Sequence, residues 1–394
     1  MLKKCLIVLL PLVIGGAVVA PASQSCSTFM LSHDDYLLVG HNLDQEFYTP
    51  GMIHVNRRGE LKRSVSGFDL QLSDVETPLH TWEARYGSVT FSPLGRNLPD
   101  GGMNEVGLTV NEMGLGDSFF PFSDSLPTML IHLWIQYQLD NFGTVAEVLS
   151  HLGDFNIEPS STFSPPASAN YHFFVTDSAG RFAIIEFLKN GPRVYTDESA
   201  PIPVLCNSRY QQELERLARY RGMVGWFRRQ FDSGKDLRCV NGAMALEDFE
   251  FADDTHPFEY CLDLLAEMQF TGTKQWSVVY DVREKHVYFR TSRAPGTRHF
   301  NLDSLDFSPD ASPAVLEDID IQFSGDVTSS FADFTPDADR ATVGKFLRSL
   351  VSFVADTEDT DMMDKHMLEN YGFDVQGYTD RAIALTELIR RGRE

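Results

Sequence analysis

Apolar residues recur along this chain with two different periods between Ser27 and about Thr291. Short runs rich in Val, Ile, Phe and Tyr, bounded by turn residues, are typical of strands. Longer runs with apolar residues three and four positions apart are typical of helices that bury one face. The pattern predicts strands at residues 36–42, 53–56, 86–91, 107–113, 172–176, 181–187, 204–207, 276–281 and 287–290, and helices at residues 128–140, 145–152, 210–220, 237–246 and 258–268.

Two turn-forming segments join neighbouring strands directly. Asp177-Ser178-Ala179-Gly180 and Val282-Arg283-Glu284-Lys285 each separate two predicted strands by only a few residues. Connections this short make hairpins, and hairpins make antiparallel sheets. Because helices alternate with these strands, the pattern favours an α+β protein in which helices cover the sheets.

The pattern changes near residue 300. Residues 301–336 are acidic and irregular, and the helices predicted beyond them span residues 340–355, 359–370 and 379–391. We therefore expect three parts, which are a signal peptide with a short stub at 1–25, a main domain at 26–300, and an acidic linker with a helical extension at 301–394.

The first residues have the features of a secretory signal peptide. Lys3 and Lys4 give a positive start, residues 5–20 are an apolar run, and Ala20-Pro21-Ala22 has the small residues of a signal-peptidase site. The run is short for a membrane span, which needs roughly 20 residues, so an uncleaved anchor is the less favoured reading. We expect an exported protein, periplasmic or secreted, with no stable membrane insertion.

The place of the cut decides the chemistry of Cys26. A cut after Ala22 leaves Ser23-Gln24-Ser25 in front of it, to be removed in a second event, and a cut after Ser25 makes Cys26 the first residue. A lipoprotein signal would instead attach a lipid to Cys26. Ser23 stands where such signals usually carry Leu, so a lipoprotein is the less favoured alternative.

The charge of the chain excludes one class of partner. The formal net charge is −23, and loss of the first 25 residues, which hold two lysines and no acid, would bring it to −25. A charge of this sign disfavours binding to nucleic acid or to an anionic membrane surface.

Cysteine is scarce in this chain. Of the five cysteines, Cys5 lies in the signal peptide, and Cys26, Cys206, Cys239 and Cys261 remain. None of them forms a Cys-x-x-Cys pair, so we expect no zinc site. Cys206 and Cys239 are expected either to fill small buried spaces or to form a disulfide if their strand and helix meet.

Cys26 is the candidate nucleophile, because its position after a signal peptide offers a thiol and a free α-amino group on one residue. A free thiol has a pKa of about 8.5, so it is mostly protonated at neutral pH. An α-amino group titrates near pH 8 and can accept that proton. Structural or disulfide-bonded cysteines are common in exported proteins, but this position favours a functional one.

Four further segments carry candidate site residues. Asp44 ends the strand-like Gly40-His41-Asn42-Leu43-Asp44 and is placed to accept a hydrogen bond from the amine of Cys26. Asp100-Gly101-Gly102-Met103-Asn104-Glu105-Val106-Gly107-Leu108 is a turn that enters a strand. Asn207 follows a buried strand and can donate to an oxyanion. Arg238 opens a helix and can place an inward charge near the nucleophile.

The order of these segments resembles the choloylglycine hydrolase family of N-terminal-nucleophile amidases, which includes bile salt hydrolases and penicillin V acylases. The resemblance covers residues 26 to about 291. It implies a four-layer αββα sandwich and the hydrolysis of linear C–N amide bonds without a metal or other cofactor. It further implies that Cys26 is the nucleophile, Asp44 pairs with its amine, Asn207 contributes to the oxyanion site and Arg238 supports the thiolate.

Two positions depart from that resemblance. The bile salt and penicillin branches carry Arg where this chain has His41, which makes the local charge dependent on pH. The bile salt branch has an oxyanion Asn where this chain has Gly114, and Asn111 or a backbone N–H is a candidate replacement. We therefore do not expect a typical bile salt hydrolase.

The sequence thus predicts an exported amidohydrolase that cleaves a small acyl amide through a thioester. The alternative is a lipid-anchored or soluble binding protein of the same fold, in which Cys26 is acylated or only packed. Residues 116–126 and 155–169 are the loops expected to set specificity, and the sequence leaves self-association open.

Overall fold

The structure is a computed structural model that describes most of the chain after the predicted signal peptide. It describes residues 26–33, 35–66, 76–159, 170–222, 224–225, 236–250, 256–269, 274–356 and 375–390. The signal peptide, the predicted helix at 359–370 and most of the loop at 155–169 lie outside these residues.

A seven-stranded sheet carries the N-terminal end of the described chain. In spatial order its strands are β14 (Val204–Leu205), β1 (Ser27–His33), β2 (Tyr36–Gln45), β15 (Lys274–Asp281), β16 (His286–Thr291), β17 (Arg298–Asn301) and β19 (Gly325–Asp326). All these neighbours pair antiparallel except β17 and β19.

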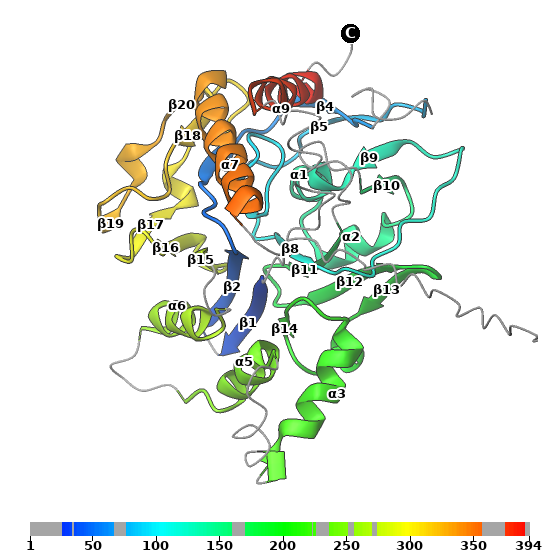
Figure 1. Cartoon of the computed structure of the whole chain (residues 1–394), viewed down its shortest axis with the longest axis vertical. Helices are drawn as coiled ribbons and strands as arrows, with labels where there is room; N and C mark the ends of the chain where they lie inside the picture. The colour runs from blue at the N-terminus through cyan, green and yellow to red at the C-terminus, as the bar shows by residue number, and fades with distance from the viewer. Residues whose placement is uncertain are drawn as a thin grey trace, which may run out of the picture.

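A nine-stranded sheet stacks on the first (Figure 1). In spatial order its strands are β13 (Gly191–Tyr195), β12 (Phe182–Leu188), β11 (Tyr171–Thr176), β8 (Thr109–Gly114), β7 (Gly101–Asn104), β6 (Ser88–Ser92), β3 (Met52–Asn56), β18 (Ala314–Leu316) and β20 (Ala332–Asp333). Two small sheets pair β4 (Leu61–Arg63) with β5 (Thr81–Glu83), and β9 (Thr128–Leu130) with β10 (Asn156–Glu158).

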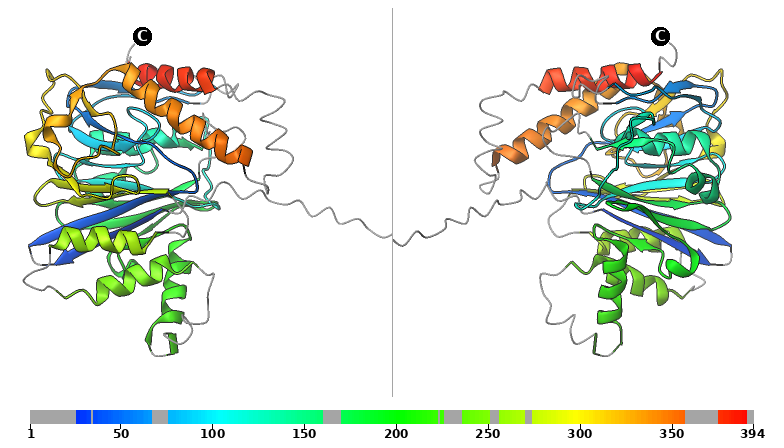
Figure 2. Two further views of the ribbon diagram at one scale, coloured as in Figure 1. Left: turned by 60° about the vertical axis from the view of Figure 1, so that its left-hand side comes forward. Right: turned by 90° about the vertical axis from the view of Figure 1, so that its right-hand side faces the viewer.

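Helices cover the outer faces of both sheets. Figure 2 shows one helical group below the seven-stranded sheet and another above the nine-stranded sheet. The first group is α3 (Tyr210–Tyr220), α5 (Arg238–Glu247) and α6 (Pro257–Glu267), and the second is α1 (Ile131–Asn141), α2 (Val145–Ser150), α7 (Pro336–Asp356) and α9 (Val375–Arg390). The predicted four-layer αββα sandwich is confirmed.

Three large apolar cores hold the layers together, and a small fourth cluster joins Met52 and Val315 to Ala338 of α7. One lies between the two sheets, one between the nine-stranded sheet and its helices, and one between the seven-stranded sheet and α5 and α6. Along β1, Met30 faces the core between the sheets, while Phe29 and Leu31 face the helices. This is the alternation that a strand with two buried faces requires.

One glycine allows β1 and β2 to pair closely. Gly40 lies opposite Phe29 in the antiparallel register. A Cβ at this position would stand 2.6 Å from the Phe29 ring. Only glycine therefore lets the aromatic ring lie flat across the neighbouring strand.

Most predicted elements are present, and the differences have local causes. Residues 128–130, predicted as the start of a helix, form β9 because they pair with β10, and the helix begins at Ile131. Residues 301–336, predicted as an irregular acidic stretch, contain β18, β19 and β20, which extend the edges of both large sheets. Strands of two or three residues give too short a pattern to recognise.

The two C-terminal helices are anchored by apolar contacts and buried charges. Val343 and Leu347 of α7 and Leu385 of α9 belong to the same core as α1. Beneath them, Arg390 and Arg96 pair with Glu60 at 3.2 and 2.7 Å. The helices therefore complete the sandwich.

A buried histidine–carboxyl pair lies under α7. His54 Nε2 is 3.3 Å from Asp339 Oδ1, and neither side chain is exposed to solvent. Burial lowers the pKa of His54 to about 3 and raises the pKa of Asp339 to about 7. Both groups are therefore favoured in their neutral forms.

The two groups of this pair act on stability in opposite directions as pH changes. The lowered pKa of His54 makes its contribution to the free energy of unfolding rise between about pH 3 and pH 6.5, and Asp339 opposes that rise. The folded protein binds a proton at Asp339 more tightly than the unfolded chain, whose Asp pKa is about 3.9, so this contribution to the free energy of unfolding falls as pH rises from about 4 to about 7. In Asp339→Asn, which keeps an acceptor for the Arg96 N–H, we expect that fall to be smaller by on the order of 2 kcal/mol. Urea unfolding at a series of pH values measures it.

The matched control is Asp337→Asn, which removes an exposed acid from the first turn of the same helix. It should leave the pH dependence as in the unmodified protein. Equal slopes for both variants would show that Asp339 is ionised in the folded state.

Candidate active site

Cys26 lies at the head of β1, where the two sheets meet. It is 1% exposed and belongs to the core between the sheets. Ser27 pairs with Asn42, which brings Cys26 beside the end of β2. The backbone N–H of Asp44 donates a hydrogen bond to the Cys26 sulfur. The pairing of β1 with β2 therefore brings the candidate nucleophile and the predicted acidic partner together.

The surroundings of Cys26 keep its thiol protonated. Burial raises the pKa of Cys26 well above its usual range, and the negative charge of Asp100 raises it further. The charges of Asp44 and Glu112 act in the same direction, while the hydrogen bond from the Asp44 N–H opposes them. A thiol in such a place needs a nearby base to become a nucleophile.

Arg238 joins the nucleophile to the predicted oxyanion residue. Its Nη1 donates to the Cys26 carbonyl oxygen at 3.2 Å, and its Nη2 donates to Asn207 Oδ1 at 3.0 Å. Asp236 holds the guanidinium on its other side, accepting from Nε at 3.0 Å and from Nη2 at 2.8 Å. Although burial alone would lower the pKa of Arg238, the hydrogen bonds to Asp236 and the charge of Asp44 raise it.

Asn207 lies between Arg238 and β8. Its side-chain oxygen accepts from Arg238, so its amide nitrogen must point the other way. That nitrogen donates to the Gly114 carbonyl at 3.0 Å. Gly114 stands where the bile salt branch has its oxyanion Asn, and its backbone is therefore in direct contact with Asn207.

His41 bridges β1 and the turn before β7. Its Nδ1 is 2.8 Å from Thr28 Oγ1, and its Nε2 is 2.7 Å from Asp100 Oδ2. All three side chains are buried. His41 therefore links the Thr28 hydroxyl of β1 to the Asp100 carboxyl through its two ring nitrogens. His41 thus positions Asp100, the acid that most strongly affects the thiol.

Asn111 is buried in β8 and is not exposed to solvent. Its amide nitrogen and oxygen have no hydrogen-bond partner among the described residues. Met113, two residues further along β8, accepts a hydrogen bond from Thr28 in the facing sheet at 2.9 Å. Since alternate residues of a strand share a face, Asn111 also faces the sheet that carries Cys26. A buried amide without partners is costly unless a ligand or water satisfies it.

The structure brings together most of the predicted site. Cys26, Asp44, Asn207 and Arg238 form one group at the head of β1, and His41 and Asn111 lie on the faces between the sheets. Pattern reasoning missed Thr28, Glu112 and Asp236, and it singled out the turn that begins at Asp100 without giving that residue a role. The roles of all four depend on contacts across sheets or within a turn. Asp236 carried a usable signal, because a carboxylate two residues before an inward arginine is a natural counter-charge.

The described cysteines are all free thiols. Cys206 and Cys239 share a thiol hydrogen bond, which contributes to raising the pKa of Cys239 after the larger effect of burial. Cys206 Sγ also lies 3.8 Å from Ser27 Oγ. Of the two expectations for this pair, the structure shows packing and not a disulfide.

No His, Cys, Asp and Glu side chains among the described residues gather in a group of three or more suited to a metal ion. Within that same part of the chain, no helix has the length and apolar character to cross a bilayer.

Comparison with known proteins identifies the class to which this site belongs. A sequence model of the "Linear amide C-N hydrolases, choloylglycine hydrolase family" matches residues 26–238, from the candidate nucleophile to the predicted arginine. The chain belongs to this family. It is a hydrolase that acts on linear amide C–N bonds.

Individual relatives are distant in sequence. The chain is 23% identical over 355 residues to a penicillin V acylase of Pectobacterium atrosepticum, covering 80% of this chain and 90% of the relative. The solved penicillin V acylase of Agrobacterium tumefaciens is similar with a TM-score of 0.62 at 22% identity, covering 79% of this chain and 98% of the other. A mutant form of the conjugated bile acid hydrolase from Clostridium perfringens gives a TM-score of 0.58 at 15% identity, covering 73% of this chain and 95% of the other.

The acids around Cys26 predict a measurable effect on thiol reactivity. Asp100→Asn removes a negative charge that raises the pKa of Cys26 and keeps an acceptor for His41. We expect the pH midpoint of Cys26 alkylation by iodoacetamide to fall by on the order of one unit. Mass spectrometry of the Cys26 peptide across a pH series gives that midpoint.

The control for this measurement is Asp263→Asn, which removes an exposed acid from α6. Its midpoint should match that of the unmodified protein. If Asp100→Asn also left the midpoint unchanged, Asp100 would not be ionised beside the thiol.

Proposed function

We propose that this protein is an exported N-terminal-cysteine amidohydrolase that cleaves the C–N bond of a small acyl amide through a thioester. One observation carries the proposal, which is that the Cys26 thiol is buried and that the charges of three carboxyl groups raise its pKa further. Such a thiol is a poor nucleophile until a base is supplied. Removal of residues 1–25 would create that base, the α-amino group, on Cys26 itself.

In the proposed reaction the α-amino group of Cys26 accepts and returns the proton at each step. The α-amino group takes the thiol proton as sulfur attacks the amide carbonyl carbon, and it then gives that proton to the departing amine. The C–N bond breaks and a thioester remains. Water then attacks the thioester carbonyl, and the α-amino group of Cys26 takes a proton from that water. The C–S bond breaks, the carboxylic acid leaves, and the Cys26 thiol regains its proton.

The neighbouring residues have proposed roles that follow from their contacts. Asp44 orients the α-ammonium group, and Arg238 fixes the Cys26 backbone while holding Asn207 by its oxygen. That contact turns the Asn207 amide N–H groups toward β8, where the developing oxyanion would be stabilised. Asn111 and the backbone beside Gly114 are the further candidate donors, and His41 is a positioning residue that holds Asp100.

The proposed substrate class rests on the family and on the site. The related proteins are named for penicillin V and for conjugated bile acids, which are both acyl amides. The formal charge of −23 disfavours nucleic acid as a partner. The sequence pattern of residues 1–25 supports export to the periplasm or outside the cell.

The decisive experiment determines the N-terminus of the exported protein and its activity together. Intact mass and N-terminal sequencing should show a chain that begins with an unmodified Cys26. Cys26→Ser and Cys26→Ala should lose at least about a thousandfold in turnover of a penicillin V or acyl-amino-acid amide while folding normally. Cys261→Ala, on the helical side of the sheet, should keep its activity.

Two results would overturn the proposal. A fully active protein that begins at Ser23 would show that the α-amino group of Cys26 is not the base. A diacylglyceryl mass on Cys26 would block both its thiol and its amine, and would favour a lipid-anchored binding protein.

A further inference from the structure

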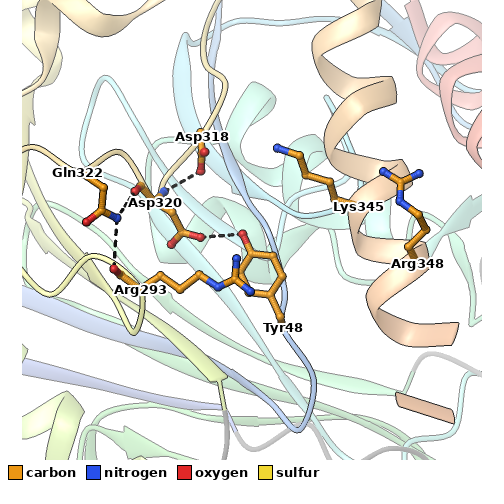
Figure 3. Close-up of a pocket in the computed structure, with 7 residues that line it drawn as sticks. All are labelled: Tyr48, Arg293, Asp318, Asp320, Gln322, Lys345 and Arg348. Atoms are coloured by element: carbon orange, nitrogen blue, oxygen red, sulfur yellow. Dashed lines mark hydrogen bonds between the residues drawn. The ribbon is translucent and has the colours of Figure 1, made fainter. Parts of the chain in front are cut away.

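A hollow that Cys26 does not line lies where α7 faces the loops that follow three strands. It has a volume of about 440 Å³. Tyr48 comes from the segment after β2, Arg293 from the loop after β16, and Asp318 and Asp320 from the segment after β18, with Lys345 and Arg348 on α7 opposite (Figure 3).

Three cationic side chains line this hollow without an ion-pair partner among the described residues. The Arg293 guanidinium stacks on the Tyr48 ring, with its carbon 3.3 Å from the ring centre. Lys345 and Arg348 are three residues apart on α7 and so lie on one face of the helix. All three side chains are exposed to solvent.

The two carboxylates of the hollow, Asp318 and Asp320, already interact with other groups of the protein. Asp320 accepts from the Tyr48 hydroxyl at 2.6 Å and from the Thr291 hydroxyl at 2.5 Å. Burial lowers the pKa of Arg298 to about 10, and the negative charges of Asp320 and Asp318 oppose that effect. These acids therefore act as counter-charges for the buried Arg298.

The hollow thus has an excess of positive charge. Three lining cations face two carboxylates that already act on Arg298, in a chain whose formal charge is −23. Unpaired cations around a concave space are what recognition of a carboxylate or a phosphate requires. The volume is within the range of sites for small molecules.

We propose that this hollow binds the oxyanion group, carboxylate or phosphate, of a small molecule. Lys345 and Arg348 contact the anion from α7, and Arg293 contacts it from the opposite side. Tyr48 is held in place by Asp320 and forms the platform under Arg293.

The ligand would connect α7 to the strand that carries Asp44. Phe47 packs against Phe346 and Phe353 of α7, with ring centres 5.6 and 5.7 Å apart. Phe47 and Tyr48 follow Asp44 within four residues. An anion between α7 and Arg293 therefore stabilises the segment that continues directly from the candidate active site.

Binding is tested on the exported protein by isothermal titration calorimetry at low salt, with inorganic phosphate and succinate as probes. We expect saturable binding of at least one probe with a Kd of about 1 mM or tighter, and weaker binding as salt increases. Phosphate binding alone would assign a phosphate ligand, and succinate binding alone would assign a carboxylate ligand.

Variants connect that binding to the hollow. Lys345→Ala with Arg348→Ala should weaken it at least about tenfold. Asp318→Asn removes a repelling charge but keeps the oxygen that accepts from the Asp320 N–H, so it should tighten binding severalfold, which damage to the fold cannot do. Lys189→Ala with Arg193→Ala removes two exposed cations near β13, at the opposite edge of the nine-stranded sheet, and should change Kd less than about twofold.

Three results would overturn the proposal. The first is no saturable heat with either probe up to about 20 mM. The second is an equal loss of affinity in the control pair, which would show that only overall charge matters. The third is an unchanged Kd in both Asp318→Asn and the α7 pair.

Discussion

The antiparallel register between β1 and β2 is the constraint on which the rest of the site depends. It sets Ser27 against Asn42 and Thr28 against His41, and so places Cys26 beside the end of β2. A shift of one residue would turn every side chain of β1 to the opposite face. Cys26 would then face the helices, and Phe29 would lose its place over Gly40.

The chain places charge around Cys26 in two separate groups. Asp100 comes from the turn before β7 and Glu112 from β8 of the nine-stranded sheet, and burial together with the charge of Asp100 raises the pKa of Glu112. Arg238 and Asp236 come from the helical side, where each charge has a partner at hydrogen-bond distance. Because uncompensated charges are costly in a buried place, the site contains a charge pair on one side and, on the other, Glu112 with a pKa raised toward its neutral form.

Sequence patterns predicted the long elements and the chain order of the site, because both depend on local periodicity. The helix at 210–220 has the predicted bounds, and the order from Cys26 to Arg238 pointed to the family. The His41–Asp100 contact spans 59 residues and has no local signature. The short strands beyond residue 301 form only because a sheet edge is available to them.

Much of the site is built from residues that are distant in the chain, and this bears on the order of folding. The Asn42 side chain donates to the Leu265 carbonyl at 2.7 Å, and Arg238 reaches Cys26 across 212 residues. Contacts of such separation form late, because each must first close a long loop of chain. Cys26 therefore lacks its contact with Arg238 until residue 238 has been synthesised, so a complete site requires most of the chain to be present.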